Sequence, residues 1–381
     1  MRRSLRWALV AMIVPVAIPL GAQRPALIKL KPASGQHPEE FTTVFALREL
    51  ADGRVLVSDS RENRLVVLDF RTGVTKAVGR TGRGPNEYSR AATLFALGAD
   101  STLMPDPGSR RWLILAKDSI VVTVPPDDRA VLAVDAFPRA ADARGNLLAR
   151  RERAITEAPI EETTSRDSSA FVMVDRARAR QDTIAWAMPL PRRTQQTKNA
   201  KGEITSMSVM PIGVLGYEES GTLFPDGWFA IARHRPFRVD WRSPNGTWTK
   251  GAPLPVAPIR VDARERSAYM ERNAENYRPR PELPPEFALK PPTPADFPDI
   301  IPPFPSGTGS LIAGPDGVLI IRRTKSADFP ASNYFFVDRQ GKLLGELALP
   351  ANETVVGAGQ RTLYIAVKDE DDILRLRRHP W

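Results

Sequence analysis

Short apolar runs alternate with polar turn clusters along most of this chain. The stretch from Phe41 to Tyr88 shows the pattern at its clearest, and its apolar runs are rich in β-branched and aromatic residues. Such residues favour pleated, half-buried strands, which typically have about five or six residues. The Asp-Gly pair at Asp52 is typical of a two-residue hairpin turn. The runs are Thr42–Leu47, Val55–Val57, Leu65–Phe70 and Val74–Val78. Together they predict one four-stranded antiparallel sheet.

The same succession of strands and turns recurs along the rest of the chain. The repeats begin near Thr93, Val131, Gly221, Gly309 and Val355. Six sheets of this size predict an all-β fold: a six-bladed β-propeller of four-stranded antiparallel blades that covers residues 41–381. The last blade shows only three strands in the sequence.

A strand from the N-terminal segment 23–40 is expected to complete the last blade. Pro25–Lys31 (PALIKLK) places Ala26, Ile28 and Leu30 on one face, as a strand with a period of two requires. Pairing of this segment with the last blade would close the ring and remove an exposed edge strand. The sequence therefore predicts Pro25–Lys31 as the closing strand, followed by a linker.

One part of the chain breaks the strand pattern and predicts a helical and proline-rich insertion at about 257–306. Asp262, with Glu265 three residues later, resembles a capping box, and residues 263–277 predict one helix. The segment Pro279–Pro305 holds eleven prolines, which exclude regular helix and strand interiors. Its phenylalanines and isoleucines indicate that it packs against the ring.

Polar and glycine-rich stretches are expected to connect the strands at the surface. Gly79–Tyr88 (GRTGRGPNEY) suits a crossing from one blade to the next. A phosphate-binding loop is the competing interpretation, but no Gly-Lys-Ser/Thr follows and no helix pattern begins there. The polar stretches 152–168 and 189–203 predict exposed loops.

Two motifs carry a resemblance to a known family. VLVSDSRENRLVVLDFRTG, within 55–73, resembles the repeat of NHL-type six-bladed propellers, and GRTGRGPNEY resembles the linker of their bacterial secreted members. The chain is thus similar to six-bladed β-propellers of the NHL-repeat or TolB-like type. The resemblance implies the fold and leaves the activity open, because propellers host many unrelated functions.

The first 22 residues have the features of a secretory signal peptide. Arg2, Arg3 and Arg6 form a positive region, Ala8–Leu20 forms a short apolar core, and Gly21-Ala22 is a small-residue cleavage site. The run is too short for a transmembrane helix. We expect a periplasmic or secreted bacterial protein, monomeric and without a transmembrane segment.

Composition removes several classes of function. The chain has no cysteine, which excludes thiolate zinc sites, cysteine nucleophiles and disulfides. The net charge of +10 would suit nucleic acid, but export and the absence of aromatic stacking platforms speak against such a partner. The sequence shows no HExxH, Gly-x-Ser-x-Gly or Ser-x-x-Lys signature of common hydrolases.

The resemblance places the ligand on one face of the ring, called here the loop face. This face carries the loops between the second and third strands of each blade and the crossings between blades. The candidate ligand-binding residues on it are Asp59, Asn63, Asp106, Arg110, Arg150, Arg151, His234, Arg235, Arg322, Arg323, Lys368 and Asp369.

Several of these residues also have a purely structural interpretation. Asp59 and Asn63 match repeat positions at which side chains cap turns. For His234, a polar surface histidine is favoured over a general base, because no acid partner can be placed beside it. The acidic run after Lys368 lacks the glycine of a calcium loop, so a solvated turn is expected.

Two interpretations of function follow. The first is a non-catalytic exported propeller that binds a small ligand or a protein partner through its loop face. The second is a lactonase-like, metal-dependent hydrolase with carboxylates converging on an ion in the central channel. The resemblance supplies no metal ligands residue by residue, so the first is preferred. No cofactor is expected, and a divalent cation such as calcium is left open.

Export predicts cleavage after Ala22. Mass spectrometry of the exported protein is expected to show an N-terminus close to Gln23. Replacing Ala22 with Arg should leave the precursor uncleaved, because the cleavage site requires small residues. An intact Met1 on the exported wild-type protein would contradict the prediction.

Overall fold

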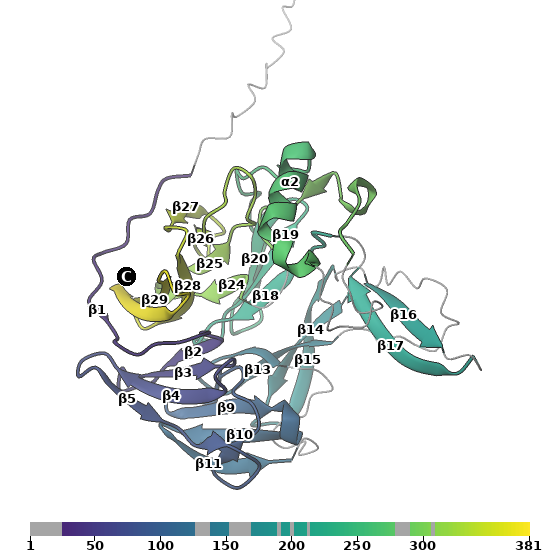
Figure 1. The fold of residues 1–381 in the computed structure, drawn as a ribbon. Helices are drawn as coiled ribbons and strands as arrows, with labels where there is room; N and C mark the ends of the chain where they lie inside the picture. Colours follow the sequence, from purple (N-terminus) through teal and green to yellow (C-terminus); the bar gives the residue numbers. More distant parts are fainter. Residues whose placement is uncertain are drawn as a thin grey trace, which may run out of the picture.

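A computed structural model describes residues 25–125, 138–151, 169–188, 192–198, 202–211, 214–278, 290–305 and 309–381. It confirms an all-β, six-bladed propeller of four-stranded antiparallel blades (Figure 1). The predicted signal peptide, the start predicted for the third blade and the polar stretch 152–168 lie outside the described residues.

The blades follow one another along the chain. Blade one holds β2 (Ala46–Glu49), β3 (Val55–Asp59), β4 (Arg64–Asp69) and β5 (Val74–Ala77). Blade two holds β8 (Phe95–Ala96), β9 (Ser101–Asp106), β10 (Arg111–Ala116) and β11 (Ser119–Val124). Blade three holds β12 (Pro138–Ala141), β13 (Leu147–Arg151), β14 (Ser169–Asp175) and β15 (Arg180–Ala187).

The second half of the ring repeats this order. Blade four holds β18 (Ser220–Leu223), β19 (Phe229–His234), β20 (Phe237–Arg242) and β21 (Trp248–Thr249). Blade five holds β24 (Leu311–Ala313), β25 (Leu319–Arg322), β26 (Asn333–Val337) and β27 (Leu343–Ala348). Blade six holds β28 (Glu353–Gly359), β29 (Thr362–Lys368), β30 (Leu374–Pro380) and β1 (Gly35–Gln36).

Second strands are buried on both sides because each blade is covered by its two neighbours. In β3, Leu56 packs toward blade two in a cluster with Met104 and Leu113, whereas Val55 and Val57 pack toward blade six. This explains why the second strands are continuous apolar runs with no alternation. The first strands contact one another from blade two through blade six and on to blade one, which places them along the central channel.

The ring closes through the N-terminal segment, but not through the predicted residues. Gly35–Gln36 pairs with β30, with Gly35 opposite Arg378. Pro25–Lys31 is not the closing strand: only Leu27 forms a bridge, parallel to Glu346 in blade five. Ile28 and Leu30 still pack on the apolar cluster between blades five and six, as their predicted position on one face requires. Pro25–Lys31 therefore forms an extended strap along the outer rim.

Two stretches of chain inserted at blade crossings add structure to the ring. The crossing into blade four carries a hairpin of β16 (Arg192–Lys198) and β17 (Ile204–Pro211). The prediction of an exposed loop over 189–203 is therefore wrong. The alternation of Thr, Gln, Ser, Met and Val in this stretch fits two paired strands. In Figure 1 the hairpin stands out from the ring.

The second insertion precedes blade five. It contains β22 (Ile259–Arg260), α2 (Ala263–Arg272), the 3₁₀ turns η2 (Ala274–Tyr277) and η4 (Pro294–Asp296), and β23 (Ile300–Ile301), which pairs with β22. Asp262 accepts a hydrogen bond from the Glu265 amide at 2.9 Å, as the predicted cap requires. The helix ends at Arg272, earlier than predicted.

Both insertions enter the ring on the loop face, because each joins the end of one blade to the first strand of the next. Short strands elsewhere on this face complete the first crossing, where β6 (Arg80–Thr81) lies parallel to β7 (Glu87–Tyr88). The longest connections therefore surround blade four and leave blades one and two with short turns.

The closing contact predicts different effects for two N-terminal deletions. Removing residues 23–31 takes away the packing of Ile28 and Leu30 but leaves β1, so calorimetry should show a melting temperature lowered by a few degrees. Removing residues 23–38 also takes away β1 and leaves β30 with an open edge. The longer deletion is expected to lower the melting temperature further and to produce self-association. Equal melting temperatures for the two deletions would contradict the assignment of Gly35–Gln36 as the closing strand.

Candidate functional site

In four of the six blades, the last residue of the second strand binds the backbone of the crossing that enters its own blade. In blade one, Asp59 is fully buried and accepts hydrogen bonds from the amides of Thr42 at 2.9 Å and Thr43 at 3.3 Å. Its other oxygen accepts from the amides of Arg61 and Glu62 in the turn. This agrees with the turn-capping interpretation.

Asp106 has the same role in blade two. It accepts hydrogen bonds from the amides of Ser89 and Arg90, and Arg111 Nε donates to its second oxygen at 2.9 Å. Burial alone would raise the pKa of Asp106, but the hydrogen bonds from Ser89 and Arg111 outweigh it and lower the pKa. The carboxylate is therefore held in its charged form as part of the frame.

Blades four and five place hydrogen-bond donors at this position. In blade four, His234 Nε2 lies 2.6 Å from the Glu218 carbonyl oxygen. In blade five, Arg322 Nη2 donates to the Gly309 carbonyl oxygen at 3.1 Å. The crossing is thus fixed through its amides in the first blades and through its carbonyl oxygens in the later ones.

The expectation of a surface position for His234 is wrong. The residue is 7% exposed, and its ring stacks on Phe304 of the insertion with centroids 4.2 Å apart. Tyr217 packs edge-on against the same ring. Burial is the main cause that lowers the pKa of His234 to about 4, so the ring is neutral in the folded protein.

The other candidates serve mainly as contacts within the loop face. Asn63 accepts from the Ala91 amide at 2.8 Å and donates to the Ser89 carbonyl, which fixes the first crossing. Arg110 adopts a left-handed conformation at the end of a 3₁₀ turn. Arg151 donates to Gln181 at 2.9 Å on the neighbouring part of its own blade.

The remaining candidates lie on the insertion side and on blade six. Arg235 donates to the Tyr217 hydroxyl at 2.7 Å, and Arg323 binds both oxygens of Glu346 at 2.8 and 2.9 Å. Lys368 pairs with Asp372. Asp369 accepts from the amides of its own turn, as expected of a solvated turn.

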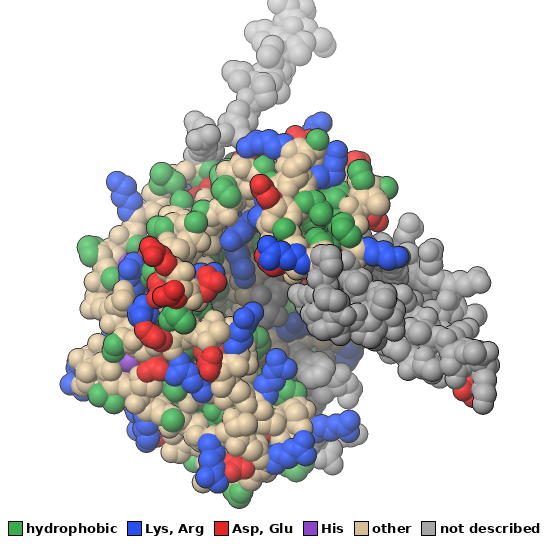
Figure 2. All heavy atoms as spheres, in the orientation of Figure 1, with side chains coloured by type: hydrophobic (Ala, Val, Ile, Leu, Met, Phe, Trp, Pro, Cys, Tyr) green, Lys and Arg blue, Asp and Glu red, His purple; other side chains and the backbone are tan. Residues whose placement is uncertain are grey.

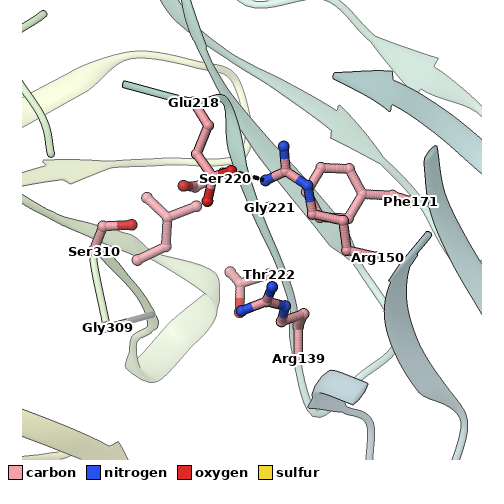
Figure 3. A pocket seen from close by; sticks show the side chains of 10 residues that line it. Arg139, Arg150, Phe171, Glu218, Ser220, Gly221, Thr222, Gly309 and Ser310 are labelled. Atoms are coloured by element: carbon pink, nitrogen blue, oxygen red, sulfur yellow. Dashed lines mark ion pairs between the residues drawn. The ribbon is translucent and has the colours of Figure 1, made fainter. Parts of the chain in front are cut away.

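A pocket with a cavity volume of about 60 Å³ opens at the channel between blades three, four and five; it is called here the mouth pocket. It is lined by Arg139, Arg150, Phe171, Glu218, Ser220, Gly221, Thr222, Gly309, Ser310 and Leu311. Figure 3 shows these residues around one space; they come from β12, β13, β14, β18 and β24 and from the residues just before β18 and β24. Among the predicted candidates, only Arg150 lines the pocket, and Arg322 binds its wall at Gly309.

Arg150 is the fixed element of the mouth pocket. Its guanidinium pairs with Glu218 at 3.1 Å and donates to Ser169 Oγ at 2.9 Å and to the Glu219 carbonyl at 3.0 Å. It also lies over the Phe171 ring, with the guanidinium carbon 5.5 Å from the ring centroid. These contacts connect blade three to the crossing that enters blade four and hold both charges in place.

Sequence reasoning missed the residues that the first strands contribute. Arg139 on β12 and Thr222 on β18 line the pocket because first strands border the channel. Arg139 is largely exposed, whereas Thr222 is mostly buried. A search confined to loops overlooks such positions.

Cationic side chains influence one another near the start of the loop that follows β25. Desolvation, followed by the nearby guanidinium groups of Arg322 and Arg272, lowers the pKa of Lys325. Figure 2 shows Lys and Arg side chains around the central hollow, with Asp and Glu gathered over the side of blade six.

The donor set does not fit the lactonase-like interpretation. Within the part of the chain that the structure describes, no group of three or more His, Asp or Glu side chains is placed to hold a metal ion. The carboxylates Asp59 and Asp106, which could have faced the channel, are used to fix crossings. In the same described part, no helix is long and apolar enough to cross a membrane.

Comparisons with known proteins bear on the fold alone. No family model and no curated protein matches the chain. Among solved structures, the chain resembles a streptogramin B lyase, with 12% identity over 92% of this chain and 89% of that one and a TM-score of 0.38. A DUF4221 family member from Bacteroides vulgatus has 10% identity over 93% and 97% of the two chains, with a TM-score of 0.47.

A third similar structure is a putative gluconolactonase. It has 12% identity over 94% of this chain and 97% of that chain, with a TM-score of 0.40. These likenesses concern propellers of different activities, so they assign none to this chain.

The lowered pKa of His234 predicts an acid-sensitive loop face. The unfolded chain binds the proton near the ordinary pKa of 6.5 and the folded chain only near about 4, so stability is lost as the pH falls between these values. The loss should approach about 3 kcal/mol. Denaturant titrations from pH 7 to pH 4 should show a smaller loss for His234→Phe, which keeps a ring against Phe304 but does not titrate. Equal losses in both proteins would contradict the prediction.

Proposed function

We propose that this chain is an exported, non-catalytic binding propeller of the NHL-repeat or TolB-like type that holds a small ligand in the mouth pocket. The observation that carries the proposal is the convergence of the longest connections on one sector of the loop face. Connections of this kind carry function when a rigid scaffold positions them. Blades one and two, whose turns are short, supply the scaffold.

The lining of the mouth pocket suits binding. Its apolar walls come from Phe171 and Leu311, and its polar groups are few and convergent, as in small-molecule sites. The charged side chains that line it are two arginines and Glu218. Arginine keeps its proton in proteins, so the two arginines orient a ligand and do not transfer protons to it.

A protein partner is the second occupant considered. The hairpin β16–β17 stands out from the ring beside the mouth pocket's sector (Figure 1), and a projecting hairpin could present a strand edge to another chain. The pocket favours a small ligand, because side chains of three blades line one concave site. Export is supported by the features of residues 1–22 and by the lack of cysteine.

A blocking substitution tests the proposed site. Thr222→Phe adds an aromatic ring to a strand position that lines the pocket, and Thr123→Phe adds the same ring to the exposed outer strand β11. Each purified protein is incubated with a bacterial metabolite extract, and native mass spectrometry then identifies bound small molecules. The wild type and Thr123→Phe are expected to retain the same ligand, and Thr222→Phe is expected to lose it.

Two results would overturn the proposal. One is a ligand retained equally by Thr222→Phe, which would place the site elsewhere. The other is a saturated binding signal that appears only when other proteins are present, which would make a protein the partner.

A further inference from the structure

We propose that the loop face of blades one and two is a docking surface for an acidic segment of a protein partner. The surface is formed by four arginines and is called here the arginine patch: Arg61, Arg83, Arg90 and Arg110. It lies apart from the mouth pocket, which opens between blades three, four and five. The inference therefore goes beyond the proposed binding of a small ligand.

Three neighbouring segments of the loop face carry the arginine patch. Arg61 lies in the turn between β3 and β4, and Arg110 lies in the turn between β9 and β10. Arg83 and Arg90 lie on the crossing that joins the two blades. All four residues are exposed, and within the residues that the structure describes none of their guanidinium groups has a hydrogen bond or an ion pair. Their charges are therefore available to a partner.

Hydrogen bonds fix the backbone beneath the arginine patch. Asn63 accepts from the Ala91 amide at 2.8 Å, which joins the turn of blade one to the crossing. Asp106 accepts from two amides of the crossing, at 2.9 and 3.3 Å. Arg111 donates to the Arg83 carbonyl oxygen at 2.9 Å, which joins the crossing to the turn of blade two. The three segments therefore form one surface that is already ordered before a partner binds, which lowers the entropic cost of binding.

Few carboxylates balance the charge of the patch. Asp59 and Asp106 are fully buried and bind backbone amides. Glu87 pairs with Arg80 at 2.7 Å, and its other oxygen accepts from the Gly84 amide at 2.7 Å. In the described segments 59–63, 79–92 and 106–111, this leaves Glu62 as the exposed carboxylate. The accessible charge of the surface is therefore positive.

The neighbouring sector of the loop face indicates the kind of partner. In blade six, next to blade one, the turn between β29 and β30 exposes Glu370 and Asp371. Figure 2 shows Asp and Glu side chains gathered over this blade. A lipid surface or another polyanion of uniform charge would be attracted by the arginine patch and repelled by the acidic turn. A protein can place an acidic segment on the patch and a neutral or basic segment on blade six, so the two sectors together favour a protein.

The chemistry of the patch suits carboxylates. A guanidinium group binds a carboxylate through two parallel hydrogen bonds, a geometry that an ammonium group does not offer. Each ion pair at an exposed position contributes little, so useful affinity requires several pairs at once. Four arginines spread over two blades and a crossing therefore suit a segment with several Asp or Glu residues and not a single small anion.

A matched pair of peptides tests the charge of the partner. One fluorophore-labelled peptide alternates Glu and Ser, and the other has Gln in place of each Glu. Fluorescence anisotropy measures the binding of each to the full mature protein at low ionic strength. The Glu peptide is expected to bind at least about tenfold more tightly than the Gln peptide, and added salt should weaken its binding because exposed charges are screened.

Substitutions locate the docking surface. The double variant Arg90→Gln with Arg110→Gln should bind the Glu peptide about tenfold more weakly, as expected for the loss of two exposed ion pairs. The double variant Arg144→Gln with Arg361→Gln is the matched control and should change the affinity less than about twofold.

The control residues match the patch residues in conformation and lie in turns of the opposite face. Arg144, like Arg90, is exposed and donates its backbone amide to a buried aspartate. Arg361, like Arg110, is exposed and has a left-handed backbone conformation. Both double variants remove the same net charge, so the comparison separates the patch from the overall charge of the protein.

Several outcomes would overturn the inference. Equal weakening by the two double variants would assign the binding to net charge. Equal affinity for the Glu and Gln peptides, or an affinity that Arg90→Gln with Arg110→Gln leaves unchanged, would exclude an acidic segment on the patch. Sedimentation with phosphatidylglycerol vesicles tests the other class of partner. Vesicle binding that is lost in the patch variant, without binding of the Glu peptide, would make a lipid surface the partner.

Discussion

The structure depends on the closure of its ring. Each blade is stable because neighbouring blades cover both of its faces, so a single open edge would expose the apolar surface of two blades at once. Pairing of β1 with β30 removes that edge, and the stacking of Trp381 on Phe336 adds an aromatic contact at the same rim. The rigidity of the channel, and with it the geometry of the mouth pocket, follows from this closure.

A single position in the repeat then sets the shape of the loop face. This position is the last residue of the second strand. Asp59 and Asp106 accept hydrogen bonds from backbone amides there, whereas His234 and Arg322 donate to backbone carbonyl oxygens. The change from acceptors to donors at this position accompanies the change from short crossings to long insertions. The His234 ring is neutral, so of the two donors only Arg322 brings a positive charge to the insertion side.

Local sequence patterns predicted most of the fold and few residues of the site. The turn pairs and apolar runs predicted the blades, and Asp262 with Glu265 predicted the start of α2, because these signals act over a few residues. The closing strand was placed wrongly at Pro25–Lys31, since Gly35–Gln36 has no apolar pattern and is selected by pairing with β30. The pocket residues Arg139 and Thr222 come from different blades, and their proximity depends on the curvature of the whole ring.

The closing pair also sets the order in which the molecule can form. The contact between Ser34 and Arg378 joins residues 344 positions apart, so nearly the whole chain lies within the loop that it closes. Contacts of this separation form late, because the entropy of closing the loop is lost before any pairing energy is gained. In a chain synthesised from its N-terminus, β1 must therefore stay unpaired until blade six has been made. During that interval the incomplete ring has an open edge at each end. Intermolecular pairing is then prevented by the rate at which the ring is completed, because the closed structure does not yet exist.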